Sequence, residues 1–174
     1  MKAWPYLLAA AIILGGIIHI AAVLIWPVFV MDRLVSGIEE QVGLGVIAHA
    51  PRATSDSRTV VRPSPDLIYS ICAFDVSKAP LRISAPVPKD TYFSLSMFGD
   101  NSDNFFVVND SQLLKDTVEV ILVQNEEQSG ALGGAPIVVA PSDRGVVLFR
   151  TLIQSEDRFE ELDAIRQQAI CEVM

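Results

Sequence analysis

The sequence predicts a mainly β protein: a small antiparallel β-sandwich or partly open barrel with one C-terminal helix, plus an N-terminal transmembrane helix. Three observations predict this class. Residues 3–31 carry no formal charge, the middle of the chain holds short segments in which apolar and polar residues alternate, and the last segment repeats its apolar residues at helical spacing. A period of two is typical of strands, and a period near 3.6 is typical of helices.

The apolar N-terminal segment has the length of a membrane anchor. Crossing a hydrocarbon core of about 30 Å takes about 20 apolar residues, and residues 6–26 supply that length. Trp4, Tyr6 and Trp26 stand at its ends, where amphipathic rings prefer the membrane interfaces. The run is longer than that of a cleaved signal peptide, and the small-x-small motif at 48–50 lies far downstream, before Pro51. We therefore expect an uncleaved, single-pass integral anchor.

Few charges set the expected orientation. Lys2 and the amino terminus are positive, whereas Asp32 and Arg33 on the other flank cancel. Because positive residues favour the cytoplasmic side, we expect a bacterial inner-membrane protein with a cytoplasmic N-terminus and a periplasmic C-terminal domain. The expected division is a transmembrane anchor over residues 1–31, a helical stalk and linker over 32–56, and a β-rich periplasmic domain over 57–174.

One face of the anchor carries Ala11, Gly15 and His19, which are spaced four residues apart. Small residues at this spacing let a second helix approach closely, and an ionisable group inside a membrane is costly without a partner. One interpretation is a helix–helix interface across which His19 is hydrogen-bonded. The other is a neutral imidazole tolerated in a generic anchor, and the sequence leaves both open.

Beyond the anchor, four apolar residues between positions 34 and 42 keep helical spacing. We expect the helix to continue and to end near Gly43 or Gly45, since glycine commonly follows a helix. Pro27 is expected to kink or end the membrane part. Residues 49–57 are polar and contain Pro51, which is typical of a linker or loop.

Strands are expected in the segments between residues 58 and 151. The clearest is the segment 91–98, in which Phe93, Leu95 and Met97 alternate with polar or smaller residues before a turn-rich stretch at 99–104. The predicted strands are Arg58–Arg62, Leu67–Phe74, Leu81–Ala85, Tyr92–Phe98, Phe105–Asn109, Thr117–Gln124, Pro136–Ala140 and Gly145–Thr151.

The chain is predicted to close with a helix. Ser155 is a candidate N-cap, followed by two carboxylates in the first turn, where they suit the helix dipole. The expected apolar face consists of Phe159, Leu162, Ile165 and Ile170.

The two cysteines, Cys72 and Cys171, are expected to form a disulfide if the domain lies in an oxidising compartment. Such a bridge would join a central strand to the chain end; the alternative is two buried free thiols. No metal site is expected, because two cysteines and two histidines cannot meet when His19 is in the membrane. No cofactor is expected either.

The remaining polar clusters do not predict catalysis. The Asp100 and Asp103 cluster lacks the glycine and closing glutamate of a calcium loop and fits a plain turn. His49 falls in the apparent linker, and the chain has no Gly-x-Ser-x-Gly motif. The glycine-rich stretch at 130–134 lacks the Lys-Ser/Thr of a P-loop. The net charge of −8, without a basic stripe, excludes a nucleic-acid-binding surface.

The runs Ser64-Pro65-Asp66-Leu67-Ile68-Tyr69-Ser70, Phe74-Asp75-Val76-Ser77, Ala79-Pro80-Leu81 and Asp90-Thr91-Tyr92-Phe93-Ser94-Leu95 form a pattern over roughly residues 58–110. The pattern resembles the bacterial domain of unknown function 1254 in its short, membrane-anchored form. Leu67-Ile68 stands where that family has Thr-Leu. The resemblance implies a β-rich envelope domain and supplies no catalytic residues.

The leading functional hypothesis is a non-enzymatic interaction module that binds another envelope protein, through the Ala11/Gly15/His19 face or through an edge of the β domain. The alternative is a periplasmic domain that binds a small ligand or cell-wall glycan, with Asp66, Tyr69 and Tyr92 near its pocket. An enzyme ranks third. A deep pocket would favour ligand binding, and a flat apolar patch would favour a protein partner.

Overall fold

The computed structural model describes residues 3–58, 62–129 and 134–174. The helices of this part are α1 (Trp4–Val42) and α2 (Phe159–Arg166). The strands are β1 (Ile47–His49), β2 (Leu67–Asp75), β3 (Leu81–Pro86), β4 (Phe93–Phe98), β5 (Asn104–Asn109), β6 (Thr117–Val123), β7 (Ile137–Val139), β8 (Arg144–Leu152) and β9 (Ile170–Val173). Short 3-10 turns occupy 110–112, 126–129 and 156–158.

The strands form two sheets that do not close into a barrel, which confirms the predicted mainly β class. One sheet has the order β1-β2-β8-β4-β5, and the other has the order β7-β6-β3-β9. All pairs are antiparallel except β6 and β7, which run parallel. The parallel pairing of β7 with β6 at this edge is the one detail in which the described sheets differ from the expected antiparallel arrangement.

The two sheets share one hydrophobic core. The alternation read in β4 places Phe93, Leu95 and Met97 inside this core, where they are at most 3% exposed. The other buried members come from β2, β3, β6, β8 and β9, and so from both sheets. Burial of this apolar surface is the main force that holds the sheets together.

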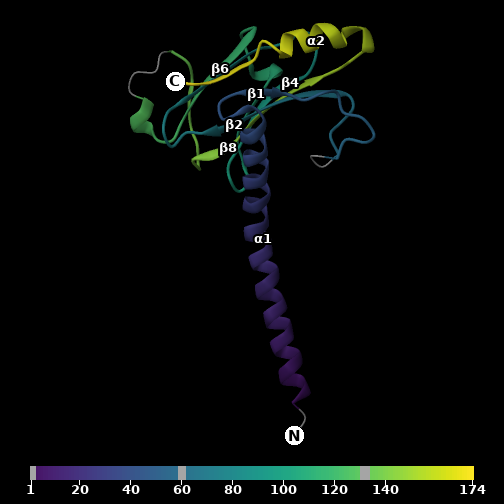
Figure 1. Cartoon of the computed structure of the whole chain (residues 1–174), viewed down its shortest axis with the longest axis vertical. Helices are drawn as coiled ribbons and strands as arrows, with labels where there is room; N and C mark the ends of the chain where they lie inside the picture. Colours follow the sequence, from purple (N-terminus) through teal and green to yellow (C-terminus); the bar gives the residue numbers. More distant parts are fainter. Residues whose placement is uncertain (1–2, 59–61, 130–133) are drawn as a thin grey trace.

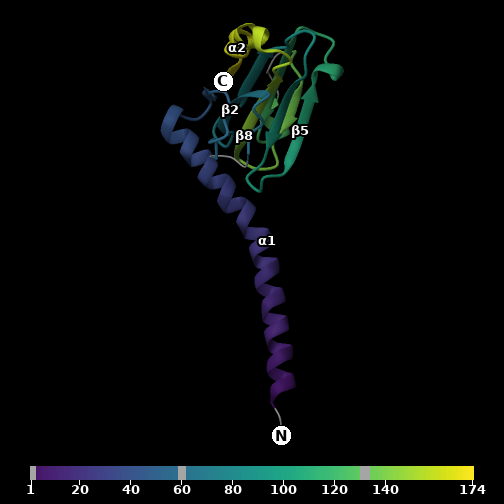
Figure 2. The same cartoon turned by 90° about the vertical axis from the view of Figure 1, so that its right-hand side faces the viewer.

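Helix α1 is continuous from Trp4 to Val42 and leaves the β domain as a single projecting rod (Figure 1). Pro27 lies inside the helix and does not end it. Its ring removes one backbone hydrogen bond, and Figure 2 shows the helix axis changing direction between its lower and upper halves. As predicted, the helix ends before Gly43, which has a positive φ of 94°.

The two halves of α1 differ in their surroundings. The N-terminal half is long and apolar enough to cross a membrane, and its most apolar stretch is not buried in the protein at all. In the C-terminal half, Met31, Val35 and Ile38 pack against Ala73 and Val146 on the outer face of the five-stranded sheet. This half is therefore part of the folded domain.

The sequence did not predict β1 and β9, and one predicted strand includes residues that the structure does not describe. β1 lies inside the segment assigned to the stalk and linker, and pairs with β2. β9 begins at Ile170, so the expectation that the last helix includes this residue is wrong: α2 ends at Arg166 and β9 pairs with β3. Ser155 precedes a 3-10 turn and makes no side-chain cap. The predicted strand Arg58–Arg62 falls on residues 59–61, outside the described residues.

Candidate functional site

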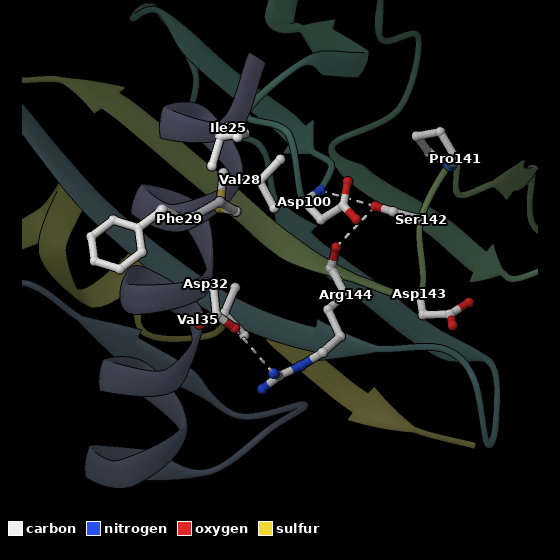
Figure 3. Close-up of a pocket in the computed structure, with 11 residues that line it drawn as sticks. Ile25, Val28, Phe29, Asp32, Val35, Asp100, Pro141, Ser142, Asp143 and Arg144 are labelled. Atoms are coloured by element: carbon white, nitrogen blue, oxygen red, sulfur yellow. Dashed lines mark hydrogen bonds and ion pairs between the residues drawn. The ribbon is translucent and has the colours of Figure 1, made fainter. Parts of the chain in front are cut away.

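A groove of about 780 Å³ lies where α1 meets the β domain (Figure 3). One wall consists of the apolar side chains Ile25, Val28 and Phe29 from α1, and the other comes from the loops around Asp100 and Ser142. Because the apolar wall adjoins Trp26, the groove lies at the end of the apolar stretch of the helix.

The polar groups of this groove join the helix to the domain. Arg144 pairs with Asp32 at 3.7 Å and with Glu39, both of which belong to α1. The Ser102 hydroxyl donates to the Pro27 carbonyl at 3.2 Å. With the apolar contacts of Met31, Val35 and Ile38, these bonds fix the helix on the sheet. We call this set the helix–sheet joint.

The joint lacks the features of an active site. The Ser142 hydroxyl donates to the Arg144 carbonyl at 3.0 Å and accepts from the Asp100 amide at 3.0 Å, so it serves the local turn (Figure 3). Among the described residues, no group of three His, Cys, Asp or Glu side chains is placed to hold a metal ion.

The three residues expected near a ligand pocket lie toward one end of the five-stranded sheet. The Asp66 carbonyl accepts from the Ile153 amide, and the Tyr92 carbonyl accepts from the Leu152 amide, so the two residues flank the end of β8 from opposite sides. Tyr69, on β2, uses its hydroxyl to accept from the Ser64 amide at 2.9 Å. None of the three lines the groove beside α1 or the smaller pocket around Thr54 and Arg62.

A polar cluster beside Tyr69 lies on the outer face of the same sheet. Register places Tyr69 opposite Arg150, and Arg150 opposite Ser94. The Arg150 guanidinium donates to the hydroxyls of Ser94 and Ser96, each at 3.1 Å. The sequence analysis missed these three residues, although alternation in β4 and β8 already assigns them to the face opposite Phe93 and Phe149.

His49 belongs to β1, not to a linker, and its side chain contacts β2. Its Nδ1 lies 2.9 Å from the Ser70 hydroxyl, which is fully buried. Burial, followed by the positive charge of Arg166, lowers the pKa of the His49 imidazole below its usual value, against an opposing effect of Asp163. The burial of Ser70 keeps substrates from its hydroxyl, so the pair is not a nucleophilic centre.

Arg166 ties this edge of the sheet to α2. It donates to the carbonyls of Ala50 and Tyr69 at 2.9 Å and 2.6 Å and pairs with Asp163 one turn earlier. An ion pair that is this well buried and hydrogen-bonded positions α2 over the end of the sheet.

The expected disulfide is present between Cys72 on β2 and Cys171 on β9, at a sequence separation of 99. It joins the two sheets through the core. On α1, residues 11, 15 and 19 lie in the exposed apolar half of the helix, where a Cβ added at Gly15 would meet no atom within 4 Å.

Comparison with known proteins matches this architecture to a family. A family model described as "Protein of unknown function (DUF1254)" matches residues 44–172, which run from just after α1 into β9. The chain belongs to this family. The resemblance noted in the sequence is therefore confirmed, and β1 and β9 of this DUF1254 chain fall within the matched region.

Two solved structures share the DUF1254 chain's fold at low identity. The VPA0106 protein from Vibrio parahaemolyticus aligns with a TM-score of 0.68 and 11% identity, over 88% of this chain and 37% of its own. A putative uncharacterized protein from Burkholderia cenocepacia aligns with a TM-score of 0.51 and 14% identity, over 83% of this chain and 40% of its own. The chain thus spans less than half of either relative. No curated protein matches it.

Proposed function

We propose that this DUF1254 chain is a single-pass protein of the bacterial inner membrane, whose periplasmic β domain binds another envelope protein without catalysing a reaction. The apolar half of α1 serves as the retained anchor. Two features support the orientation: the positive residue Lys2 at the N-terminus, and the disulfide, since such bonds persist in oxidising compartments.

The observation that carries the proposal of a protein partner is the free edge of β5. This strand is the longest of the four edge strands and reads Asn-Phe-Phe-Val-Val-Asn, without a charged residue. Figure 2 shows it at the margin of the β domain on the side away from α1. Edge strands usually carry charges, prolines or bulges that prevent pairing with another chain. The pairing of β5 with β4 shifts register beside Met97 and Phe98, so a bulge protects only the start of β5. The remaining uncharged residues favour an added strand from a partner.

The partner that we propose is an envelope protein that supplies, as a separate chain, an extended segment next to β5. The Ala11/Gly15/His19 face is a second candidate contact, for a transmembrane helix of the same partner.

Crosslinking in intact cells tests the partner. A photo-crosslinking residue at Val107 on β5 has a matched control at Val173 on β9, since both valines are about half exposed, at 52% and 55%. We expect a single adduct from position 107, whose crosslinked peptide belongs to an extended segment of one envelope protein. The absence of an adduct from 107, or the same adducts from both positions, would contradict the proposal.

Labelling with a membrane-impermeant maleimide, in cells with a permeabilised outer membrane, tests the orientation. Leu114 is fully exposed on the β domain, so Leu114→Cys should react in intact spheroplasts. Lys2→Cys should react only after the inner membrane is opened. The reverse pattern would place the domain in the cytoplasm.

A further inference from the structure

Arg150 is a partly buried arginine on the outer face of the five-stranded sheet, between β2 and β4. Its guanidinium donates hydrogen bonds to two serine hydroxyls. Among the described residues, no carboxylate oxygen lies within 4.0 Å of its nitrogen atoms, the distance that defines an ion pair. By contrast, Arg52, Arg82 and Arg158 each pair with at least one glutamate. The chain holds 21 acidic residues and has a net charge of −8, so carboxylates are not scarce. Partly buried charges are normally paired, because their desolvation is costly.

The two serines fix the guanidinium in place. Ser94 and Ser96 lie on the same face of β4 and are 0% and 1% exposed. They accept hydrogen bonds from Nε and Nη2 of Arg150, which directs one edge of the planar group toward β4. A guanidinium has five N–H donors, so about three remain after these two bonds. Each serine also keeps its own O–H donor.

The cluster therefore has free N–H and O–H donors and a positive charge, but it lacks an anionic partner among the described residues. This combination suits an oxyanion, because a carboxylate or a phosphate accepts two parallel N–H bonds from a guanidinium. An Asp or Glu of the chain itself would have served, yet none is placed there within the described residues.

The surroundings of Arg150 define the kind of molecule that carries the oxyanion. Across the outer face, Arg150 lies between Tyr69 and Ser94, and the next rung carries Ile71, Leu148 and Ser96. Leu148 and Ile71 are partly exposed and lie beside the charged group. On the following rung, Ala73 and Val146 are covered by α1. A small organic acid with an apolar body fits this combination of one cation and flanking apolar side chains.

We propose that Arg150, held in position by Ser94 and Ser96, binds the oxyanion of a small organic acid on the outer face of the five-stranded sheet. The acidic group is a carboxylate or a phosphate, both of which accept the same bidentate bond. This site adjoins β5, because Ser94 and Ser96 pair with Asn109 and Val107 of that strand, but it binds through the face of the sheet and not through the edge.

The test uses the full chain in detergent micelles, labelled with ¹⁵N in its arginine side chains. The Nε–H signal of Arg150 is identified by its absence from the Arg150→Lys spectrum. Acetate, benzoate, inorganic phosphate and phenyl phosphate are added separately at constant ionic strength. We expect at least one organic acid to move the Arg150 signal in a saturable way, with benzoate or phenyl phosphate binding more tightly than acetate or inorganic phosphate. The carboxylate and phosphate arms show which acid is preferred.

Two variants separate a specific site from general charge effects. The affinity of each variant is measured by isothermal titration calorimetry with the preferred acid. Because hydrogen bonds to a charged group are strong, Arg150→Lys should weaken this binding about tenfold or more. Arg52→Lys changes an arginine of the same domain that pairs with Glu156, and should leave the affinity unchanged. Fold is checked in each variant by circular dichroism. Non-saturable shifts, equal shifts at all arginines, or unchanged affinity in a folded Arg150→Lys variant would overturn the proposal.

Discussion

Replacement of Gly145 by alanine is expected to destabilise the β domain by about 3 kcal/mol. Gly145 is the second residue of β8, pairs with Phe74 of β2 and is buried. A Cβ added there would lie 2.1 Å from the Phe98 carbonyl oxygen and 2.6 Å from Cζ of Phe74. An ordinary C···O contact is about 3.3 Å, so the backbone of β4 would have to move by about 1 Å.

The size of this effect follows from what must move. Phe98 offers a backbone atom, which cannot rotate away, and Phe74 is fully buried in the core. Overpacking of a core typically costs about 1–3 kcal/mol, and loosening the β4–β8 hydrogen bonds adds about 1 kcal/mol. We take a value toward the upper end of this range because both contacts are severe. A domain with a stability of about 5–15 kcal/mol would still fold.

Denaturant unfolding in detergent, followed by far-ultraviolet circular dichroism, measures the change. Gly37→Ala is the matched control, because a Cβ there meets no atom within 4 Å. Since alanine favours a helix interior over glycine, this control should gain up to about 1 kcal/mol. A Gly145→Ala protein whose stability lies within about 0.5 kcal/mol of the wild type would refute this account of the β4–β8 packing.

Three further predictions concern other bonds of the domain. Replacing both Cys72 and Cys171 by serine should lower the stability of the oxidised protein by about 2–5 kcal/mol, since the bond closes a loop of 99 residues; equal midpoints with and without reductant would contradict this. Arg144→Gln should lower stability by no more than about 1 kcal/mol, because its two carboxylate partners on α1 are largely exposed, yet it should increase motion between spin labels on α1 and β8. Because the pKa of His49 is lowered on folding, the unfolded chain takes up the proton first, so stability should be full above pH 6.5 and fall as the pH drops below it. His49→Gln should reduce this acid-dependent loss, measured as the difference between midpoints at about pH 7.5 and 5.5; an identical difference in both proteins would exclude His49 as a source.

The sequence predicted the strands whose own residues show a strand pattern. The segment 91–98 alternates cleanly, and the seven predicted strands from Leu67 onward correspond to β2–β8. β1 adjoins the polar, proline-containing segment 49–57, and Ile170 of β9 continues the helical spacing of apolar residues in the last helix, so neither strand was recognised. They exist because longer strands, β2 and β3, offer them a hydrogen-bonding edge. Tertiary pairing of this kind leaves little trace in sequence.

The candidate sites show the same division. The disulfide was predictable because only two cysteines exist in the chain. Arg150 was not singled out, since its meaning depends on the register that sets it between Tyr69 and Ser94. The joint at Arg144 likewise depends on the packing of α1 against the sheet. The spacing of apolar residues in the stalk indicates a helix with an apolar face, but it does not indicate which surface that face covers.

The unbroken course of α1 limits where the β domain can go. In the proposed topology, only residues 27–30 separate Trp26, at the membrane interface, from Met31, the first residue buried against the sheet. At 1.5 Å per residue these four give about 6 Å of free height. The domain therefore travels with its anchor as one rigid body at the lipid surface. A soluble partner must therefore bind close to the lipid surface. Any rotation of the anchor by a neighbouring helix would turn the β5 edge toward or away from that partner.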